Sequence, residues 1–342
     1  MKFLIIRLSS IGDIVLTTAL IRVLRNQYKD AQIDFLTDKA FKDILINNPY
    51  IDNLILYDKT KSIKDNSIIK KDLDTDYNII DLQNNLRSIL FRKSLGSYVK
   101  LNKKIIQKFK LVHFKHKTKS ISSIPIDYIN SASKFNIKYD DQGLEFWLPN
   151  EKTSSVYPPN QRQDIYKLNR IAVAPGAKHF TKRWNSNYFV ELINKINSNY
   201  NNIEFYLIGG KDDKAVCQEI FNKTKTINSS INIVDYSGQT SLISTASIID
   251  KVNLMISNDT GVMHIAAARK IPVTAIFGST TKDFGFSPFG VPYIICENNN
   301  LTCRPCSHIG RHSCPKGHFD CMNKLTAENV FSDLQQFIKL HY

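Results

Sequence analysis

The chain has 342 residues, 42% of them hydrophobic, and a formal net charge of +15 at pH 7. This length is enough for two domains of ordinary size, and the apolar content excludes global disorder. No apolar run approaches the roughly 18 residues that a bilayer-spanning helix needs. The short apolar stretch at the start has no small-residue cleavage site and continues as strand, turn and helix, so we expect a mature cytoplasmic protein.

The positive charge predicts an anionic partner, either nucleic acid, a phosphorylated substrate or an acidic membrane surface. It concentrates between residues 92 and 119, where there are ten lysines and arginines and no aspartate or glutamate. Two interpretations of this run stay open, a solvated basic face and a docking surface for anions.

Strand-like apolar runs alternate with helix-like segments, a pattern typical of parallel sheets covered by helices on both faces. Strands are expected at residues 2–8, 32–36, 53–57, 77–82, 170–174, 203–208, 232–235, 254–257 and 272–277. Helical patterns between them include 14–28, 185–197 and 213–226.

The alternation stops at LPNEKTSSVYPPNQRQD, residues 148–164, whose composition is typical of a linker. We therefore predict two α/β domains, 1–150 and 165–325, joined by a linker at 151–164. A last helix within 326–342 follows the second domain, and its return onto the first domain is one expectation.

Ligands of open α/β sheets bind where strands end and helices begin. The first such turn is SSIGD, residues 9–13, in which Gly12 permits a tight turn and Ser10 offers a hydroxyl. Asp13 either caps the following helix or serves as a general base, and the turn alone leaves both roles open.

Two turns of the second domain predict an anion site. The first is APGAKHFTKRW, residues 174–184, in which Lys178, Lys182 and Arg183 place positive charge beside a helix start. An ordinary basic loop would have the same composition and is the alternative. In SNDTGVMHIAA, residues 257–267, Asp259 or Thr260 caps a helix and Gly261 permits close approach of a ligand. His264 lies one turn further on, where a structural histidine is the alternative.

Four cysteines near the C-terminus, Cys303, Cys306, Cys314 and Cys321, follow a C-x2-C-x7-C-x6-C spacing. Because disulfides are disfavoured in the cytosol, this cluster predicts a structural zinc site or a redox-sensitive clip, with free packed thiols as the alternative. Asp212 and Asp213 in LIGGKDD could accept ribose hydroxyls or begin the next helix.

Taken together, the motifs resemble glycosyltransferase family nine, the bacterial ADP-heptose:lipopolysaccharide heptosyltransferases. The resemblance rests on RLSSIGDIVLTTAL, DLQNNLRS, APGA…TKRW, IGGKDD, SGQTSLISTASIIDKVNLMISNDTGVMHIAAA and IPVTAIFGST, in the family's order and over nearly the whole chain. It implies two Rossmann-like domains facing across a cleft, the glycosyltransferase B fold, with the acceptor on the first domain and the nucleotide sugar on the second.

The resemblance also implies an inverting transfer that needs no catalytic metal. Asp13 would deprotonate the acceptor and Lys182 would hold the diphosphate. The donor would meet Asp259 at the sugar, Thr260, Gly261 and His264 at the diphosphate, and Thr240 at the adenine. Either Asp212 or Asp213 would meet the ribose. Ala177 and Lys178 stand where some relatives have hydroxyl residues, so Thr181 is the nearest hydroxyl. We place the acceptor against Ser10, Gly12, Gln83 and Arg87.

The expected donor is therefore ADP-heptose, and the expected acceptor is a phosphorylated glycolipid such as a lipopolysaccharide core. The expected location is peripheral, on the inner face of the inner membrane, where the basic run would meet anionic lipid. A sugar-nucleotide epimerase or hydrolase on the same scaffold is the alternative enzyme. A non-catalytic nucleic-acid-binding protein would explain the charge, but the sequence holds no recognisable nucleic-acid module, so no nucleic acid is expected.

Overall fold

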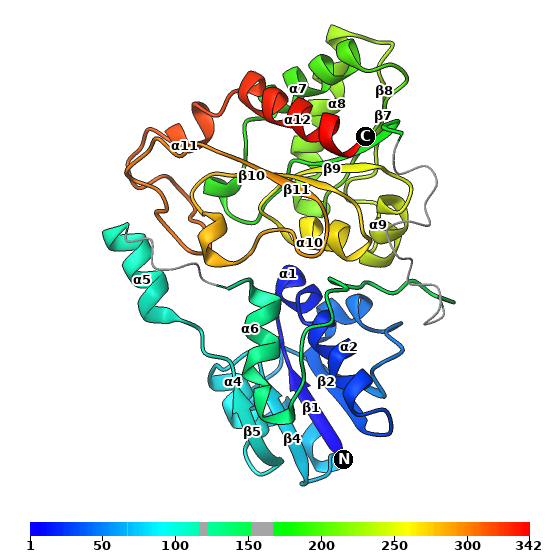
Figure 1. Cartoon of the computed structure of the whole chain (residues 1–342), viewed down its shortest axis with the longest axis vertical. Coiled ribbons are helices and arrows are strands. Elements are labelled where there is room, and N and C mark those ends of the chain that lie inside the picture. Colours follow the sequence, from blue (N-terminus) through cyan, green and yellow to red (C-terminus); the bar gives the residue numbers. More distant parts are fainter. Residues whose placement is uncertain (67, 116–121, 152–166) are drawn as a thin grey trace. The chain divides into compact units, whose positions relative to one another are not determined.

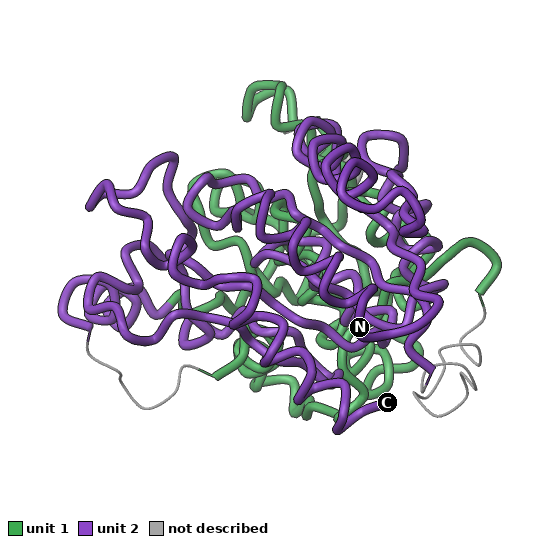
Figure 2. The backbone as a smooth tube through the Cα atoms, turned by 90° about the horizontal axis from the view of Figure 1, so that it is seen from above, with its two compact units in different colours: residues 1–103, 122–156 green, residues 104–121, 157–342 purple. Residues whose placement is uncertain are grey.

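A computed structural model describes residues 1–66, 68–115, 122–151 and 167–342 of the chain. The chain divides into two compact units, coloured separately in Figure 2. Unit 1 contains residues 1–103 and 122–156, and unit 2 contains residues 104–121 and 157–342. Most of the expected linker and the end of the basic run lie outside the described residues. No helix in the described ranges has the length and apolar character to cross a membrane.

Unit 1 is built on a five-stranded sheet of order β3-β2-β1-β4-β5, in which every pairing is parallel. The central strand is a continuous apolar run because helices or loops cover both faces of the sheet, which buries Phe3, Leu4, Ile5 and Ile6 completely. The strands are β1 (Lys2–Ile6), β2 (Gln32–Asp38), β3 (Asn53–Tyr57), β4 (Tyr77–Asp81) and β5 (Gly96–Lys100).

Five α-helices of the described residues belong to unit 1, and Figure 1 labels α1, α2, α4 and α6 beside its sheet. The expected helix at 14–28 is divided in two, because the hydroxyls of Thr17 and Thr18 donate back to the carbonyls of Ile14 and Val15. The helices are α1 (Ile11–Val15), α2 (Thr18–Gln27), α3 (Ile63–Asn66), α4 (Leu86–Arg92) and α6 (Ile124–Ser131).

Unit 2 is built on a six-stranded parallel sheet of order β11-β10-β9-β6-β7-β8. The strand order turns back at the β6/β9 pair, so the loops after these two strands diverge at the carboxyl edge and leave room for a ligand. The strands are β6 (Arg170–Ala174), β7 (Glu204–Leu207), β8 (Asn232–Asp235), β9 (Leu254–Asn258), β10 (Val273–Phe277) and β11 (Tyr293–Glu297).

Helices cover both faces of the unit 2 sheet. Figure 1 shows α7, α8 and α12 on one side of it and α9 and α10 on the other. The last helix buries Val330, Phe331, Leu334 and Ile338 in the same core as Ile256 of β9. The helices of unit 2 in the described ranges are α5 (Ile105–Phe114), α7 (Ser186–Asn199), α8 (Lys214–Ile227), α9 (Leu242–Ile249), α10 (Gly261–Ala268), α11 (Asp320–Asn323) and α12 (Ala327–His341).

The predicted α/β class with two Rossmann-like units is confirmed, but two edge strands escaped prediction. β5 is mostly exposed, and β11 follows a long irregular loop, so neither stretch has the apolar pattern of a buried strand. Residues 104–115 also group with unit 2 rather than with the first domain. Lys115 Nζ donates to the carbonyls of Cys303 and Pro305, at 3.2 and 2.6 Å, which ties this segment to unit 2.

Candidate active site

In unit 1, the turn after β1 holds an ion pair between Arg7 and Asp13. Arg7 Nη2 lies 2.7 Å from Asp13 Oδ1. On the other carboxylate oxygen, the Ser10 backbone N–H and hydroxyl donate to Oδ2 at 3.1 and 2.8 Å. Asp13 is therefore part of a capping box at the start of α1 and still leaves its side chain partly exposed to solvent.

Tyr128 of α6 completes the surroundings of this carboxylate. Its hydroxyl donates to Asp13 Oδ1 at 3.4 Å, and its ring faces the Arg7 guanidinium at 5.7 Å from the centroid. Burial, above all, keeps the pKa of the Tyr128 phenol far above its usual value, so the phenol stays a neutral hydrogen-bond donor. The sequence patterns did not point to Arg7 or Tyr128, because neither belongs to the glycine-bearing turn itself.

The pKa of the Asp13 carboxyl lies below its usual value. Burial alone would raise this pKa, but the charge of Arg7 and the hydrogen bonds from Ser10 outweigh that effect. The carboxylate is thus ionised at neutral pH and can accept a proton, with reduced intrinsic basicity.

Of the four predicted acceptor residues, three lie at the Asp13 turn. Gln83 Oε1 accepts hydrogen bonds from the Leu8 and Ser9 backbone N–H groups, so its amide fixes the path of the turn. Ser10 is exposed beside the carboxylate and Gly12 is buried within α1. Arg87 is exposed on the first turn of α4.

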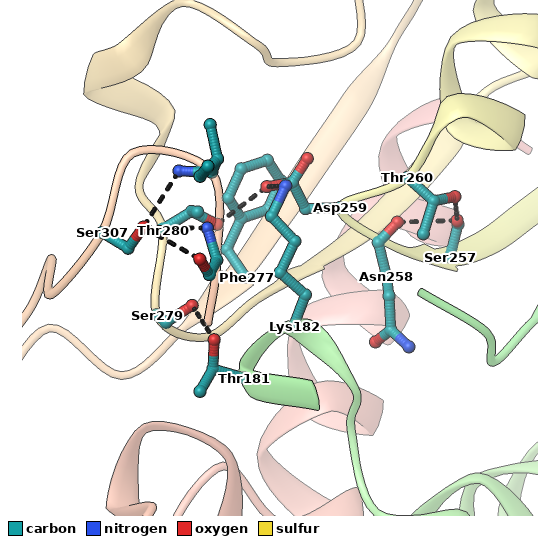
Figure 3. A network of polar contacts seen from close by, with 12 residues as sticks. Thr181, Lys182, Ser257, Asn258, Asp259, Thr260, Phe277, Ser279, Thr280 and Ser307 are labelled. Carbon is teal, nitrogen blue, oxygen red and sulfur yellow. Dashed lines mark hydrogen bonds and ion pairs between the residues drawn. The ribbon is translucent and has the colours of Figure 1, made fainter. Parts of the chain in front are cut away.

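In unit 2, Lys182 and Asp259 form an ion pair at the carboxyl edge of the sheet (Figure 3). Lys182 Nζ lies 2.7 Å from Asp259 Oδ2, and Thr280 Oγ1 donates to the same oxygen at 2.8 Å. Lys182 ends a short 3-10 helix after β6, whereas Asp259 directly follows β9. The two predicted donor residues therefore come together, and each neutralises the other in the absence of ligand.

Thr181, the hydroxyl residue predicted to meet the donor, directly precedes Lys182. It is buried, and its hydroxyl accepts hydrogen bonds from the Arg311 N–H and the Ser279 hydroxyl, both at 2.8 Å. These contacts commit the hydroxyl within the protein (Figure 3). They also fix the backbone next to Lys182.

Asn258, missed in the sequence, anchors the loop that carries Lys182. Its amide nitrogen donates to the Pro175 carbonyl at 2.7 Å, and its oxygen accepts from the Trp184 N–H at 3.3 Å. The side chain is fully buried at the end of β9. The only available signal was a polar residue closing an otherwise apolar strand.

The remaining predicted donor residues surround the same edge. Thr260 precedes α10, whose first residue is Gly261, so the unpaired amides of that helix start lie beside Asp259. His264 is buried one turn into α10. Thr240 bonds to Thr245 through their hydroxyls at 2.8 Å.

Asp213 has an internal role that the sequence only partly indicated. Its Oδ2 accepts from the Gly210 N–H at 3.0 Å, and a Cβ at Gly176 would lie only 2.1 Å from its carboxyl carbon. Gly176 thus allows the turns after β6 and β7 to touch. Asp212 is exposed next to it, so of the two aspartates it is the freer to meet a ribose.

The cysteine segment supports the donor edge through its backbone. The Cys306 N–H donates to the Ser279 carbonyl at 3.1 Å, and Arg304 donates to the Thr280 carbonyl at 2.8 Å. All four predicted cysteines are free thiols, and Cys303 Sγ lies 3.9 Å from His318 Nε2. Burial raises the pKa of the Cys321 thiol to about 12. Within the described ranges, no three His, Cys, Asp or Glu side chains are arranged to hold a metal ion.

Two Rossmann-like units with parallel sheets have the fold of glycosyltransferases of the B-fold class. The sequence model of glycosyltransferase family 9 (heptosyltransferase) matches residues 69–315, and the chain belongs to this family. It is therefore a glycosyltransferase enzyme, as the motifs had indicated.

Individual relatives agree with this assignment. The chain is 26% identical over 338 residues to lipooligosaccharide heptosyltransferase 2 of Campylobacter jejuni, covering 96% of each sequence. A family 9 glycosyltransferase structure from Veillonella parvula has a TM-score of 0.75 at 19% identity, covering 99% of this chain and 97% of that one. The structure of E. coli ADP-heptose LPS heptosyltransferase II has a TM-score of 0.68 at 19% identity and covers 99% of both chains.

Proposed function

We propose that this glycosyltransferase moves a heptose from ADP-heptose to a lipopolysaccharide core or related glycolipid, with inversion and without a catalytic metal. The observation that carries the proposal is the Lys182–Asp259 pair beside the start of α10, with Thr280 holding the carboxylate. A lysine and free helix amides at one edge suit a nucleotide diphosphate. The relatives named above supply the sugar and the acceptor class.

In the proposed reaction, the bond between the anomeric carbon and the diphosphate oxygen breaks, and ADP leaves with that electron pair. The acceptor oxygen forms the new bond on the opposite face, and its proton passes to the Asp13 carboxylate. Lys182 and the α10 amides neutralise the charge that grows on the leaving diphosphate. Asp259 exchanges its contact with Lys182 for the hydroxyls of the donor sugar.

The other assignments are part of the same proposal. Either Asp212 or Asp213 would meet the ribose, and Thr240 would meet the adenine. Thr260, Gly261 and His264 would support the diphosphate, with Thr181 positioning Lys182 beside it, and the acceptor would be received by Ser10, Gly12, Gln83 and Arg87. The chain would act peripherally at the inner face of the inner membrane, where its excess of 46 Lys and Arg over 31 Asp and Glu favours anionic lipid.

We keep a structural zinc at Cys303, Cys306, Cys314 and Cys321 as a proposal on the basis of ligand chemistry, because thiolates suit zinc and other soft metals. Metal analysis of the purified protein, together with a variant carrying Cys303→Ser and Cys306→Ser, tests it. About one metal ion per chain that is lost in the variant would support the site. A metal content near zero in the native protein would remove it.

The decisive experiment for the reaction follows ADP release and glycolipid mass with ADP-heptose and a heptose-free core acceptor. Asp13→Asn should abolish transfer while leaving ADP binding unchanged, because the amide cannot take the proton.

Asp65→Asn is the matched control for loss of a helix cap. Asp65 makes the same contacts at α3, where the Ser62 N–H and hydroxyl donate to its Oδ2 at 3.1 and 2.7 Å. Transfer that survives in Asp13→Asn, or is lost equally in both variants, would reduce Asp13 to a cap. Absence of any heptosyl transfer by the native protein would refute the proposed donor and acceptor.

A further inference from the structure

Helix α5 of unit 2 exposes most of its apolar side chains. Ile105 and Ile106 are each 70% exposed, Phe109 is 53% exposed and Phe114 is 71% exposed, whereas Leu111 is only 3% exposed. A helix of a soluble protein normally turns such residues toward a core. This ten-residue helix therefore has one buried side and one exposed side that is apolar.

The exposed residues form a stripe. At about 100° of rotation per residue, Ile105, Ile106 and Phe109 lie on one side of α5, and Leu111 lies roughly opposite. His113, one turn beyond Phe109, extends the stripe, since their rings lie 4.2 Å apart. Leu111 therefore marks the buried side of the helix, and Lys115 at its end bonds to the Cys303 and Pro305 carbonyls of unit 2, while the stripe lies on the opposite side. The label α5 marks the helix in Figure 1.

Lysines border the stripe on both sides. Lys108 and Lys110 flank it along the helix, and Lys104 directly precedes it. Lys115, just after the helix, is instead bonded to backbone carbonyls of unit 2. No acidic residue occurs between residues 92 and 119. Apolar residues bordered by lysines are the composition of helices that lie in a membrane surface, because lysine stems cover apolar surface while their ammonium groups reach phosphate.

We propose that α5 lies in the plane of an anionic bilayer and inserts Ile105, Ile106 and Phe109 at the boundary between headgroups and acyl chains. Charge complementarity selects this occupant, since an apolar stripe flanked by Lys108 and Lys110, in a segment without acidic residues, suits anionic lipid. The inference rests on the proposed membrane location and adds an apolar component that charge attraction alone lacks. A protein held only by a basic patch would leave the vesicles at high salt, because salt screens charge attraction. Inserted apolar side chains would retain part of the binding under the same conditions.

Unit 1 contains a competing patch on α4, where Leu86, Ile89 and Leu90 are exposed. We favour α5 because its stripe has lysines on both sides, whereas Arg92 of α4 is paired with Asp81 at 2.7 Å. The two helices can be tested separately.

Vesicle flotation with the full chain tests the insertion. Phosphatidylcholine vesicles with and without phosphatidylglycerol are compared for the native protein and for a variant carrying Ile105→Ser and Phe109→Ser. We expect the variant to bind anionic vesicles about tenfold or more weakly, because two insertions are lost. Ile227→Ser with Leu340→Ser removes two exposed apolar residues elsewhere in unit 2 and should bind like the native protein.

A tryptophan placed on the stripe reports insertion directly. The two native tryptophans, Trp147 and Trp184, are buried, so Phe109→Trp adds an exposed indole. Its emission should shift to the blue and be quenched by brominated lipid in anionic vesicles, and Leu340→Trp should show neither change. An unshifted emission at Phe109→Trp would overturn the proposal.

Two further results would also overturn it. One is loss of vesicle binding in Leu86→Ser with Leu90→Ser while the α5 variant binds normally. The other is a native dimer, seen by light scattering without lipid, that Phe109→Ser dissociates, since a second copy would then cover the stripe. Transfer to a water-soluble, delipidated core acceptor should be unchanged in the α5 variant. This assay separates failure of the membrane inference from failure of the proposed reaction.

Discussion

Arg7 and Asp13 are joined by an ion pair of 2.7 Å across the turn that follows β1. The pair keeps the Asp13 carboxylate ionised, and four donors orient it, two from Ser10, one from Arg7 and the Tyr128 hydroxyl. Asp13 is thereby held in the ionised form that can take a proton, although the lowered pKa makes it a weaker base.

Arg7→Lys and Arg7→Met should move the acid limb of the kcat/KM profile in graded steps. Because the charge of Arg7 lowers the pKa of Asp13, removal of that charge raises this pKa. Activity of Arg7→Met should therefore be lost at a higher pH on acidification, and Arg7→Lys should lie between it and the native protein. Arg25→Met, which removes an arginine paired with Asp52 in the same unit, should leave the limb in place. If the acid limb stays at the same pH in both Arg7 variants, the limb reports the titration of a group other than Asp13.

Asp259→Asn should separate nucleotide binding from transfer. The Asp259 carboxylate holds Lys182 Nζ at 2.7 Å, so it competes with an incoming diphosphate for that cation. When the Asp259 charge is removed, ADP should bind as tightly as before or more tightly, as measured by calorimetry. The kcat/KM for heptosyl transfer should fall, because a contact with the donor sugar is lost.

Lys182→Met should have the opposite signature on binding. It should weaken ADP binding and lower kcat/KM by about 100-fold or more, the usual effect of removing one charge-stabilising contact. Lys178→Met, on the exposed part of the same loop, is the matched control and should change both by little. Equal losses of ADP binding and kcat/KM in the two lysine variants would indicate general attraction by a basic loop rather than a specific contact of Lys182.

Gly176→Ala should lower the unfolding midpoint, because its Cβ would lie 2.1 Å from the Asp213 carboxyl carbon. Overpacking of this kind costs about 1–3 kcal/mol. Gly210→Ala is the control, since its nearest neighbour would be 3.8 Å away. Adding Asp213→Ala should recover part of the loss in Gly176→Ala, as measured by a double-mutant cycle of thermal unfolding. Additive losses would show that the two turns do not touch as described.

Arg304→Met should be strongly destabilising. Arg304 and Glu297 form a buried pair at 2.7 Å, so the substitution leaves a buried carboxylate without its cation, at about 3–5 kcal/mol. The double variant with Glu297→Leu should regain much of this loss, because no unpaired charge remains. Lys223→Met breaks the exposed Lys223–Glu219 pair and should cost less than about 1 kcal/mol. A small effect for Arg304→Met in chemical denaturation would contradict the buried-pair account.

Local patterns were sufficient to predict the α/β class and most of the strands. The central strands bury both faces and so read as apolar runs, and glycine-bearing polar turns mark their carboxyl ends. The edge strands β5 and β11 lack that double burial, and their pairing depends on the neighbouring strand rather than on their own composition. They were missed for this reason.

The sequence by itself determined the family, the two sheets and the turns that hold Asp13, Lys182 and Asp259, because motifs and periodicity are properties of neighbouring residues. The folded units alone decided which side chains meet. Tyr128, Asn258 and Thr280 join the candidate sites from separate elements, and the Thr181 hydroxyl turns inward to accept from the Arg311 N–H. Such contacts depend on strand order and loop packing over long separations in the chain, which no local pattern records.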